Sequence, residues 1–343
     1  MRVQAKTPAT SWPARSEAIV AVLVSVLVSA LAISVDHGGR PGCAPRLLSS
    51  GTVAGVQPLI WERRPEGLRA PALICAFKGW NDAANAASTA VDFLGESFDA
   101  QRFAAIDPEE FYDFQATRPI VRLSEGRYRD LIWPETLFRE ALAPRASRDL
   151  ILLSGDEPSY RWRTYCGLIV DLAEAMGVQI VVTLGALLAD VAHTRPVSIT
   201  GIASDDDMAS RLGLGDANYE GPSGITAVLH SACADAGIPS ASLWATVPHY
   251  VAAAPNPKAA LALVRKLEGL VGVTVDASEL ESATTDYEHQ VDRAVQSDPD
   301  VQEFVERLEA ASDTPPPPDP EEVSGDQIAN EFQRFLRQRG AEE

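Results

Sequence analysis

The sequence contains few of the residues that build disulfide frameworks or metal sites. Its 343 residues include four cysteines and five histidines. Cys43, Cys75, Cys166 and Cys233 are far apart without a Cys-x-x-Cys pair, and no His-Glu-x-x-His spacing occurs. This pattern argues against a disulfide framework and a zinc site, so we expect no metal and no cofactor. Three cysteines lie within apolar runs, which is typical of buried free thiols.

Positive charge is also scarce. The formal net charge is −19 at pH 7. Residues 276–343 contain 19 acidic and 5 basic side chains, a net of −14, which leaves −5 for residues 1–275. A protein without a basic face does not neutralise phosphates, so we expect no nucleic-acid binding.

An N-terminal extension, residues 1–55, contains a long apolar run. Residues 18–35 have no charged side chain, and Arg2, Lys6 and Arg15 precede them. This is typical of a signal peptide or a membrane anchor, and the alternative is a start codon assigned too far upstream. Because apparently unpaired thiols fit a reducing compartment, we expect a cytoplasmic protein, with anchoring or export through residues 18–35 as the alternative.

Residues 56–275 have the pattern of an α/β domain. Continuous apolar runs at 73–77, 149–153 and 178–184 are typical of strands buried on both faces. Strands that alternate with longer helices indicate a three-layer α/β/α fold with a mostly parallel sheet. We expect further strands at 103–106, 197–202 and 242–247, a hairpin at 119–133, and helices at 81–98, 135–143, 159–176, 221–236 and 256–270.

A C-terminal helical extension follows this core. Residues 276–312 form an acidic helical segment in which Ser278 opens a capping box and Pro299 begins a second helix. Residues 313–323 include four consecutive prolines and predict a stiff linker. Residues 324–343 predict an amphipathic helix that docks on its own body or on a partner. The partner-binding candidates are its apolar stripe, Ile328, Phe332, Phe335 and Leu336.

Polar residues and glycines follow the predicted strands, where open parallel sheets bind their ligands. The ligand-binding candidates are Lys78, Gly79, Trp80, Asn81, Asp156, Glu157, Gly185, Gly221, Ser223 and Gly224. The last three open a helix whose free N–H groups suit an anion. Asp82, Asp205, Asp206 and His249 are the candidate acid–base residues. If the topology is as predicted, all these loops share one edge of the sheet.

Each candidate also has a plain structural interpretation. Asn81 or Asp82 suits a helix cap, and residues 205–207 suit a solvated acidic turn. His193 has no evident Asp and Ser partners in the sequence. No complete set of nucleophile, base and orienting residue can be assembled, which favours a protein that is not an enzyme.

Four separated stretches resemble one protein family, and they occur in the same order along the chain as in that family. They are residues 73–91 with their G-W-N-D-A core, "TLGALLADVAHTRPVSITGIASD" at 183–205, residues 219–261, and "SGDQIANEFQRFLRQRG" at 324–340. Together they resemble the proteasome assembly chaperone two family in its actinobacterial form. The resemblance implies an α/β/α core similar to nucleoside phosphorylases and hydrolases, without an agreed activity. The chain ends Gly340-Ala341-Glu342-Glu343, which departs from the docking tail of several relatives.

Two functions are compatible with this resemblance. The first is a non-enzymatic assembly factor, a homo-oligomer with protein partners such as proteasome subunits. The alternative is a phosphorylase-like or hydrolase-like enzyme, or a binding protein, for a nucleoside-like or small anionic ligand. In that case Asp205 or Asp206 is the general acid, residues 221–224 hold the anion, and Trp80 stacks on a ring.

Overall fold

The computed structural model describes residues 58–124, 128–214, 220–251 and 255–312, and these residues build a mixed eight-stranded sheet. Its spatial order is β1 (Leu59–Trp61), β3 (Gln101–Ile106), β6 (Thr136–Ala141), β7 (Leu150–Asp156), β2 (Ala72–Lys78), β8 (Ile180–Ala189), β10 (Ser240–Pro248) and β9 (Ile199–Ala203). The four neighbours β7, β2, β8 and β10 are parallel. The remaining pairs in the sheet are antiparallel. The predicted α/β class is confirmed, with parallel pairing confined to the centre.

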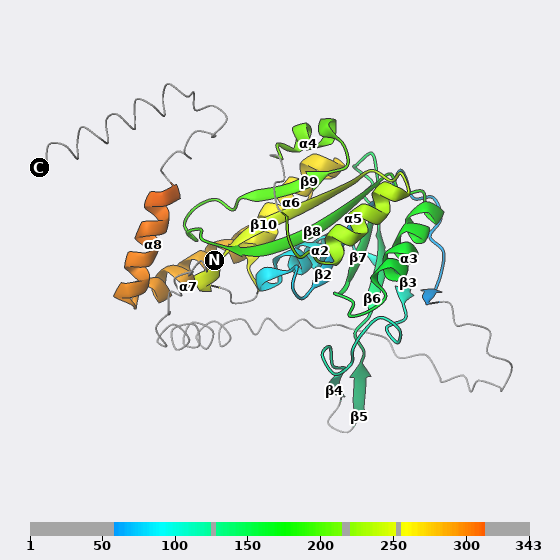
Figure 1. Cartoon of the computed structure of the whole chain (residues 1–343), viewed down its shortest axis with the longest axis horizontal. Coiled ribbons are helices and arrows are strands. Elements are labelled where there is room, and N and C mark those ends of the chain that lie inside the picture. Colours follow the sequence, from blue (N-terminus) through cyan, green and yellow to red (C-terminus); the bar gives the residue numbers. More distant parts are fainter. Residues whose placement is uncertain (1–57, 125–127, 215–219, 252–254, 313–343) are drawn as a thin grey trace, which may run out of the picture.

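Helices cover both faces of the sheet (Figure 1). One face packs against α2 (Ala86–Ser97), α4 (Asp206–Leu212) and α6 (Pro257–Val271), and the other against α3 (Trp162–Ala175) and α5 (Ile225–Asp235). Along β2, Ile74 faces the first layer, while Leu73 and Cys75 face the second. A central strand covered on both faces requires apolar residues at successive positions, which explains its continuous apolar run.

The predicted helix over residues 135–143 is wrong, because this segment forms β6. The strand pairs antiparallel with both β3 and β7. Thr136, Phe138 and Ala141 are buried, while the positions between them are half-buried. Side chains such as Leu, Arg and Glu favour helix locally, but pairing with distant strands determines this segment.

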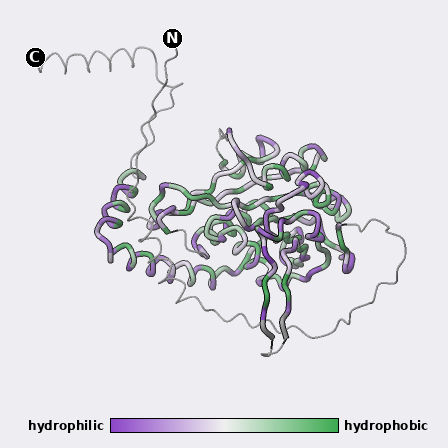
Figure 2. The backbone as a smooth tube through the Cα atoms, turned by 60° about the horizontal axis from the view of Figure 1, so that its bottom comes forward, coloured by the Kyte–Doolittle hydropathy of each residue, from purple (hydrophilic) through white to green (hydrophobic). Residues whose placement is uncertain are grey.

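A two-stranded hairpin projects from the body between β3 and β6 (Figures 1 and 2). It consists of β4 (Ile120–Ser124) and β5 (Tyr128–Ile132), as the sequence predicts. We call residues 117–124 and 128–133 the arm, and we call the edge where β2, β7, β8 and β10 end the carboxyl edge. The arm leaves from the carboxyl edge, because β6 begins opposite the end of β7.

The acidic extension forms α7 (Ser278–Gln296) and α8 (Pro299–Ser312), as predicted. Ser278 does not open a capping box, since Ala277 is the N-cap residue and the Ser278 N–H donates to Asp276 Oδ1. An apolar cluster of Ala192, Val251, Tyr287, Val291, Val295 and Val305 joins α7 and α8 to the core.

The N-terminal extension at 1–55, the linker at 313–323 and the helix predicted at 324–343 lie outside the described residues. The partner-binding candidates Ile328, Phe332, Phe335 and Leu336 belong to the last of these. Within the described part of the chain, no helix is both long enough and apolar enough to span a bilayer.

Candidate functional site

The junction after β2 brings two buried polar side chains to the carboxyl edge. The strand ends at Lys78, and Gly79 turns the chain with a φ of 118°, a conformation that favours glycine. Asn81 and Asp82 then enter the interior, with relative exposures of 0% and 4%. Buried polar groups require hydrogen-bond partners, so the partners of these two residues decide what the junction does.

Asn81 links three loops of the carboxyl edge through Glu157. Asn81 Nδ2 donates to Glu157 Oε1 at 2.6 Å, and the main-chain N–H of Ile225 donates to the same oxygen at 2.9 Å. Gly224 leaves the space for this contact, because a Cβ there would lie 2.0 Å from Asn81 Oδ1. The N-terminus of α5 therefore receives an anion from the chain itself, where the sequence suggested an external one.

Asp82 caps α2 across an intervening turn. Residues Ala83–Asn85 form a short 3₁₀ turn (η1), in which Ala84 and Asn85 have positive φ. Asp82 Oδ1 accepts the N–H of Ala87 at 2.7 Å, five residues along the chain. Burial raises the pKa of Asp82, and its hydrogen bonds and the nearby Lys78 charge oppose this. The carboxyl is thus a structural cap, one of the interpretations that the sequence allowed.

Three other candidates gather around Lys78 at the carboxyl edge. Burial raises the pKa of Asp156, and the positive charge of Lys78 opposes the shift. Lys78 is exposed, and its carbonyl accepts the N–H of Glu157 at 2.8 Å. The Trp80 side chain is 65% exposed. This arrangement offers a cation, a carboxyl and an open aromatic ring.

The remaining glycine and serine candidates differ in their surroundings. A Cβ on Gly185 would lie 2.6 Å from the ring of Trp244, so this glycine makes room for packing between β8 and β10. Gly221 and Ser223 are exposed in the segment before α5. We observe no hydrogen bond that links either of them to Lys78 or Asp156.

Asp205 and Asp206 do not share the carboxyl edge, contrary to the expectation from the sequence. Strand β9 is antiparallel to β10, and its last residue, Ala203, pairs with Ala241 near the start of β10. The loop after β9 therefore lies at the opposite edge of the sheet. Asp205 caps α4 by accepting the N–H of Met208 at 2.8 Å, and Asp206 is exposed in the first turn.

His249 follows β10 at the carboxyl edge but faces α8. It begins a 3₁₀ turn, His249–Val251 (η2). Its Nδ1 lies 3.0 Å from Asp190 Oδ1, without the alignment of a hydrogen bond. Its ring centroid lies 5.5 Å from that of Phe304 on α8. His249 is therefore part of the contact between the core and the extension.

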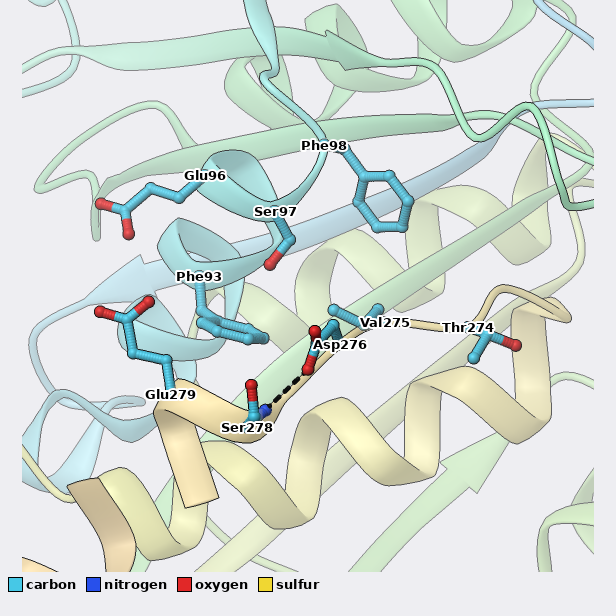
Figure 3. A pocket seen from close by; sticks show the side chains of 9 residues that line it. All are labelled: Phe93, Glu96, Ser97, Phe98, Thr274, Val275, Asp276, Ser278 and Glu279. Atoms are coloured by element: carbon cyan, nitrogen blue, oxygen red, sulfur yellow. Dashed lines mark hydrogen bonds between the residues drawn. The ribbon is translucent and has the colours of Figure 1, made fainter. Parts of the chain in front are cut away.

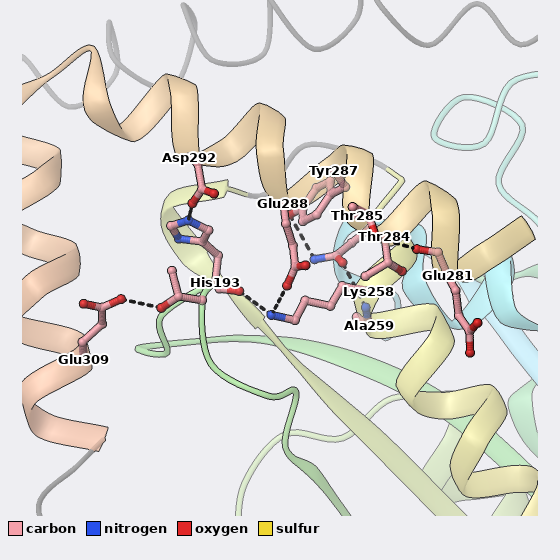
Figure 4. A network of polar contacts seen from close by, with 12 residues as sticks. His193, Lys258, Ala259, Glu281, Thr284, Thr285, Tyr287, Glu288, Asp292 and Glu309 are labelled. Atoms are coloured by element: carbon pink, nitrogen blue, oxygen red, sulfur yellow. Dashed lines mark hydrogen bonds and ion pairs between the residues drawn. The ribbon is translucent and has the colours of Figure 1, made fainter. Parts of the chain in front are cut away.

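Sequence reasoning missed a polar network that fastens α7 and α8 to the core (Figure 4). The buried His193 ring contacts the Tyr250 hydroxyl at 2.7 Å and Asp292 Oδ1 on α7 at 2.9 Å. Lys258 Nζ donates to the His193 carbonyl and lies 2.6 Å from Glu288 Oε1 on α7. The sequence held no local signal, since Asp292 lies 99 residues beyond His193.

A separate cavity of about 330 Å³ lies between the end of α2 and the start of α7 (Figure 3). Phe93, Phe98, Asp276 and Glu279 are among its lining residues, and none of the sequence candidates lines it. Within the described ranges, no group of three or more His, Cys, Asp or Glu side chains has the arrangement of a metal site. Cys75, Cys166 and Cys233 are free and buried, as expected.

Large exposed apolar side chains concentrate on the carboxyl edge and the arm. Trp80, Leu187 and Leu188 lie on the edge, and Tyr160 follows β7 there. The arm adds Ile120, Val121, Leu131, Ile132 and Trp133. The same edge therefore combines polar side chains engaged inside the molecule with apolar side chains open to solvent, a composition that suits contact with another protein.

Comparison with known proteins gives one matching family model, which is described as the PAC2 family and covers residues 76–295. A PAC2 family protein from Streptomyces avermitilis is 45% identical, with 68% of this chain and 99% of that chain covered and a TM-score of 0.64. A proteasome-assembly chaperone homologue from Mycobacterium tuberculosis is 41% identical, with the same coverage and TM-score.

An archaeal proteasome activator from Pyrococcus furiosus shares the fold alone. It is 17% identical, with 68% of this chain and 97% of that chain covered and a TM-score of 0.55. No curated protein matches the chain.

Proposed function

Because the chain belongs to the PAC2 family, we propose that it is a non-enzymatic assembly factor, a homo-oligomer whose partners are proteasome subunits. The similar protein from Mycobacterium tuberculosis is described as a proteasome-assembly chaperone homologue, which supports this choice of partner. The two chains are 41% identical over nearly the whole length of that relative.

The observation that carries the proposal is the composition of the carboxyl edge. Asn81, Asp82 and Glu157 are engaged in hydrogen bonds that hold the junction and α5 together. Trp80 and Leu188 beside them are 65% and 50% exposed. Covering apolar side chains at an open edge with a protein surface is favourable, because it removes them from water. The same side chains have no polar groups with which to bind a small polar substrate.

The second support is the acidic extension. Residues 276–312 contain eleven Asp or Glu and two Arg side chains, a net of −9. The His193 network and the apolar cluster hold α7 and α8 in a fixed position. We infer that they present the segment that follows Ser312, with Phe332 and Phe335 as anchors, to the partner.

Co-purification tests the proposal. The tagged full chain is incubated with lysate of its own organism, and captured proteins are quantified by mass spectrometry. We expect enrichment of proteasome α-subunits over a tag-only control, and loss of that enrichment in a Phe332→Ser, Phe335→Ser variant. Equal recovery of α-subunits from the full chain and from the tag-only control would refute the proposal.

A second candidate function is the binding of a nucleoside-like or small anionic ligand at the carboxyl edge. The observation that favours it is that the positive charge of Lys78 acts on two carboxyl groups, Asp82 and Asp156, whose pKa values burial raises. Calorimetric titration with nucleosides and with inorganic phosphate tests it. Binding that disappears in Lys78→Met supports this function, and an absence of heat with every compound contradicts it.

We propose a cytoplasmic location. The three free cysteines in the core support a reducing compartment. Fractionation of cells with an antibody against the core is the test. Recovery in the membrane or exported fraction would instead support a role for residues 18–35 as an anchor or signal.

A further inference from the structure

The arm exposes apolar side chains on both of its faces. Ile120 pairs with Ile132, and Val121 pairs with Leu131 in the neighbouring register position. Successive residues of a strand point to opposite faces, so each face of the arm carries one aliphatic pair. All four side chains are exposed, and Ile120 reaches 62%. The body contacts the base of the arm, where the Trp133 and Phe114 rings meet with centroids 4.9 Å apart.

A hairpin of this kind is marginally stable in water by itself. Strands β4 and β5 form a sheet of two, and no third strand pairs with them among the described residues. Two-stranded sheets generally need a further strand or a packed face for stability, and open strand edges attract other chains. The arm therefore has the composition of an element that packs against another surface.

We propose that a second copy of this chain covers the arm, and that the arm lies on the carboxyl edge of that copy. Charge favours this occupant. Among the arm side chains that the structure describes, Arg118, Arg122 and Asp130 are charged and exposed, a net of +1 in a chain of net −19. The exposed Leu187 and Leu188 on the carboxyl edge lie close in sequence to Asp190, whose side chain is 84% exposed. Aliphatic side chains would thus meet aliphatic side chains, and the arginines would meet the carboxylate of Asp190.

The arm and the edge are different surfaces of one chain. Figures 1 and 2 show the arm pointing away from the body. A contact between these two surfaces closes either as a reciprocal pair about a two-fold axis or, when it repeats head to tail and the rotation permits, as a ring. The proposal deepens the assembly function, since it assigns the surface through which copies of this chain associate.

Matched substitutions test the contact. Leu131→Ser alters the arm and Leu188→Ser alters the edge. Leu142→Ser is the control, because Leu142 is 55% exposed but follows β6 at the opposite edge. Sedimentation over a concentration series measures association of the full chain, and circular dichroism verifies folding. We expect about tenfold or greater weakening in each of the two variants, from the apolar area that each loses at the contact, and no change in the control.

Crosslinking distinguishes the second copy from the chain's own edge. A Val121→Cys chain is mixed with an isotope-labelled Leu188→Cys chain and oxidised. A disulfide between labelled and unlabelled chains supports the proposal. The proposal is overturned if the wild-type chain sediments as a monomer throughout, or if Leu131→Ser and Leu188→Ser leave association unaffected. A chain that carries both Val121→Cys and Leu188→Cys is oxidised in parallel. A disulfide that forms only within that chain would also overturn the proposal.

The outcome is separable from that of the assembly function. If the proposal on the arm is right, Leu131→Ser loses self-association. Capture of α-subunits by the same variant is measured separately, by mass spectrometry. If wild-type chains remain monomers but capture α-subunits, the arm proposal fails and the assembly function stands. If chains associate through the arm without capturing α-subunits, the arm proposal stands and the assembly function fails.

Discussion

Replacing Asn81 by aspartate should make the stability of the protein depend strongly on pH. The Asn81 carboxamide is fully buried, and its Nδ2 donates to Glu157 Oε1 at 2.6 Å. In Asn81→Asp an oxygen takes the place of that donor at nearly the same shape. Two carboxylates would then lie in contact, one at the fully buried position 81 and the other on the half-buried Glu157, so the variant must either accept their repulsion or take up a proton that the pair shares.

The structure sets the size of the effect. If the pair stays ionised, the variant loses a hydrogen bond to a charged acceptor, about 1.5–3 kcal/mol, and adds the repulsion. If it takes up a proton instead, each pH unit above the ordinary aspartate pKa of about 3.9 costs 1.36 kcal/mol. That amounts to about 2 kcal/mol at pH 5.5 and about 5 kcal/mol at pH 7.5. The less costly form determines stability, so we expect a loss of about 3–5 kcal/mol at pH 7.5 and about 2 kcal/mol at pH 5.5.

The sign follows from linkage. The introduced carboxyl has a higher pKa in the folded than in the unfolded state, so its protonation favours folding at low pH and this contribution fades as pH rises. Urea unfolding followed by tryptophan fluorescence, at both pH values and relative to wild type, measures the difference. Asn85→Asp is the control, because Asn85 is exposed in the same turn. If Asn81→Asp and Asn85→Asp show equal midpoints at pH 7.5, the hydrogen bond from Asn81 to Glu157 does not have the role in stability that we assign to it.

Three further substitutions test other contacts. Gly224→Ala should lower the free energy of unfolding by about 1–3 kcal/mol, because its Cβ would meet Asn81 Oδ1. The control, Gly269→Ala in α6, has open space around its Cβ and should raise the free energy of unfolding by about 0.5–1 kcal/mol. Equal effects in thermal unfolding would contradict this. Burial raises the pKa of Asp149, but hydrogen bonds from Arg69 and the Ala143 N–H outweigh burial, so the net pKa is lowered. The contribution of Asp149 to stability is therefore present at neutral pH and is lost as pH falls through the lowered pKa. Asp149→Asn should therefore lower the Tm at pH 7 and flatten its fall in acid; an unchanged acid limb would contradict the assignment. His193→Ala should speed hydrogen exchange along α7 and α8 but not in β2, and exposed His289→Ala should leave both unchanged; equal protection in both variants would refute the network.

The parts of the fold that depend on local pattern could be predicted from the sequence. The apolar run of β2, the turn at Gly79 and the helix after it are all present. The hairpin at 119–133 is also present, because alternating extended residues around a turn give a local signal. Burial of the three core cysteines follows from the same kind of pattern.

The parts that depend on pairing between distant segments could not. Strand β6 was predicted as a helix because its composition is helical, and pairing with β3 and β7 overrides that preference. The direction of β9 has no local signature, yet it moves Asp205 and Asp206 to the opposite edge. The bridge from Asn81 to Glu157 spans 76 residues, and the contact from His193 to Asp292 spans 99. Residue types identified the loops, but only topology shows which loops meet.

The Glu157 bridge also separates the two functions physically. An external anion that used the Ile225 N–H would have to displace a carboxylate that already accepts two donors. Displacement would leave Asn81 Nδ2 without its partner in a fully buried position, a cost of about 1–3 kcal/mol unless the ligand accepts both donors. Binding of a small anion at α5 is therefore coupled to loosening of the junction. A protein partner that covers Trp80 and Leu188 uses side chains that are already exposed, and it requires no such change. The folded structure can therefore contact a protein partner without rearrangement, whereas an anion at α5 must first break the hydrogen bonds of Glu157.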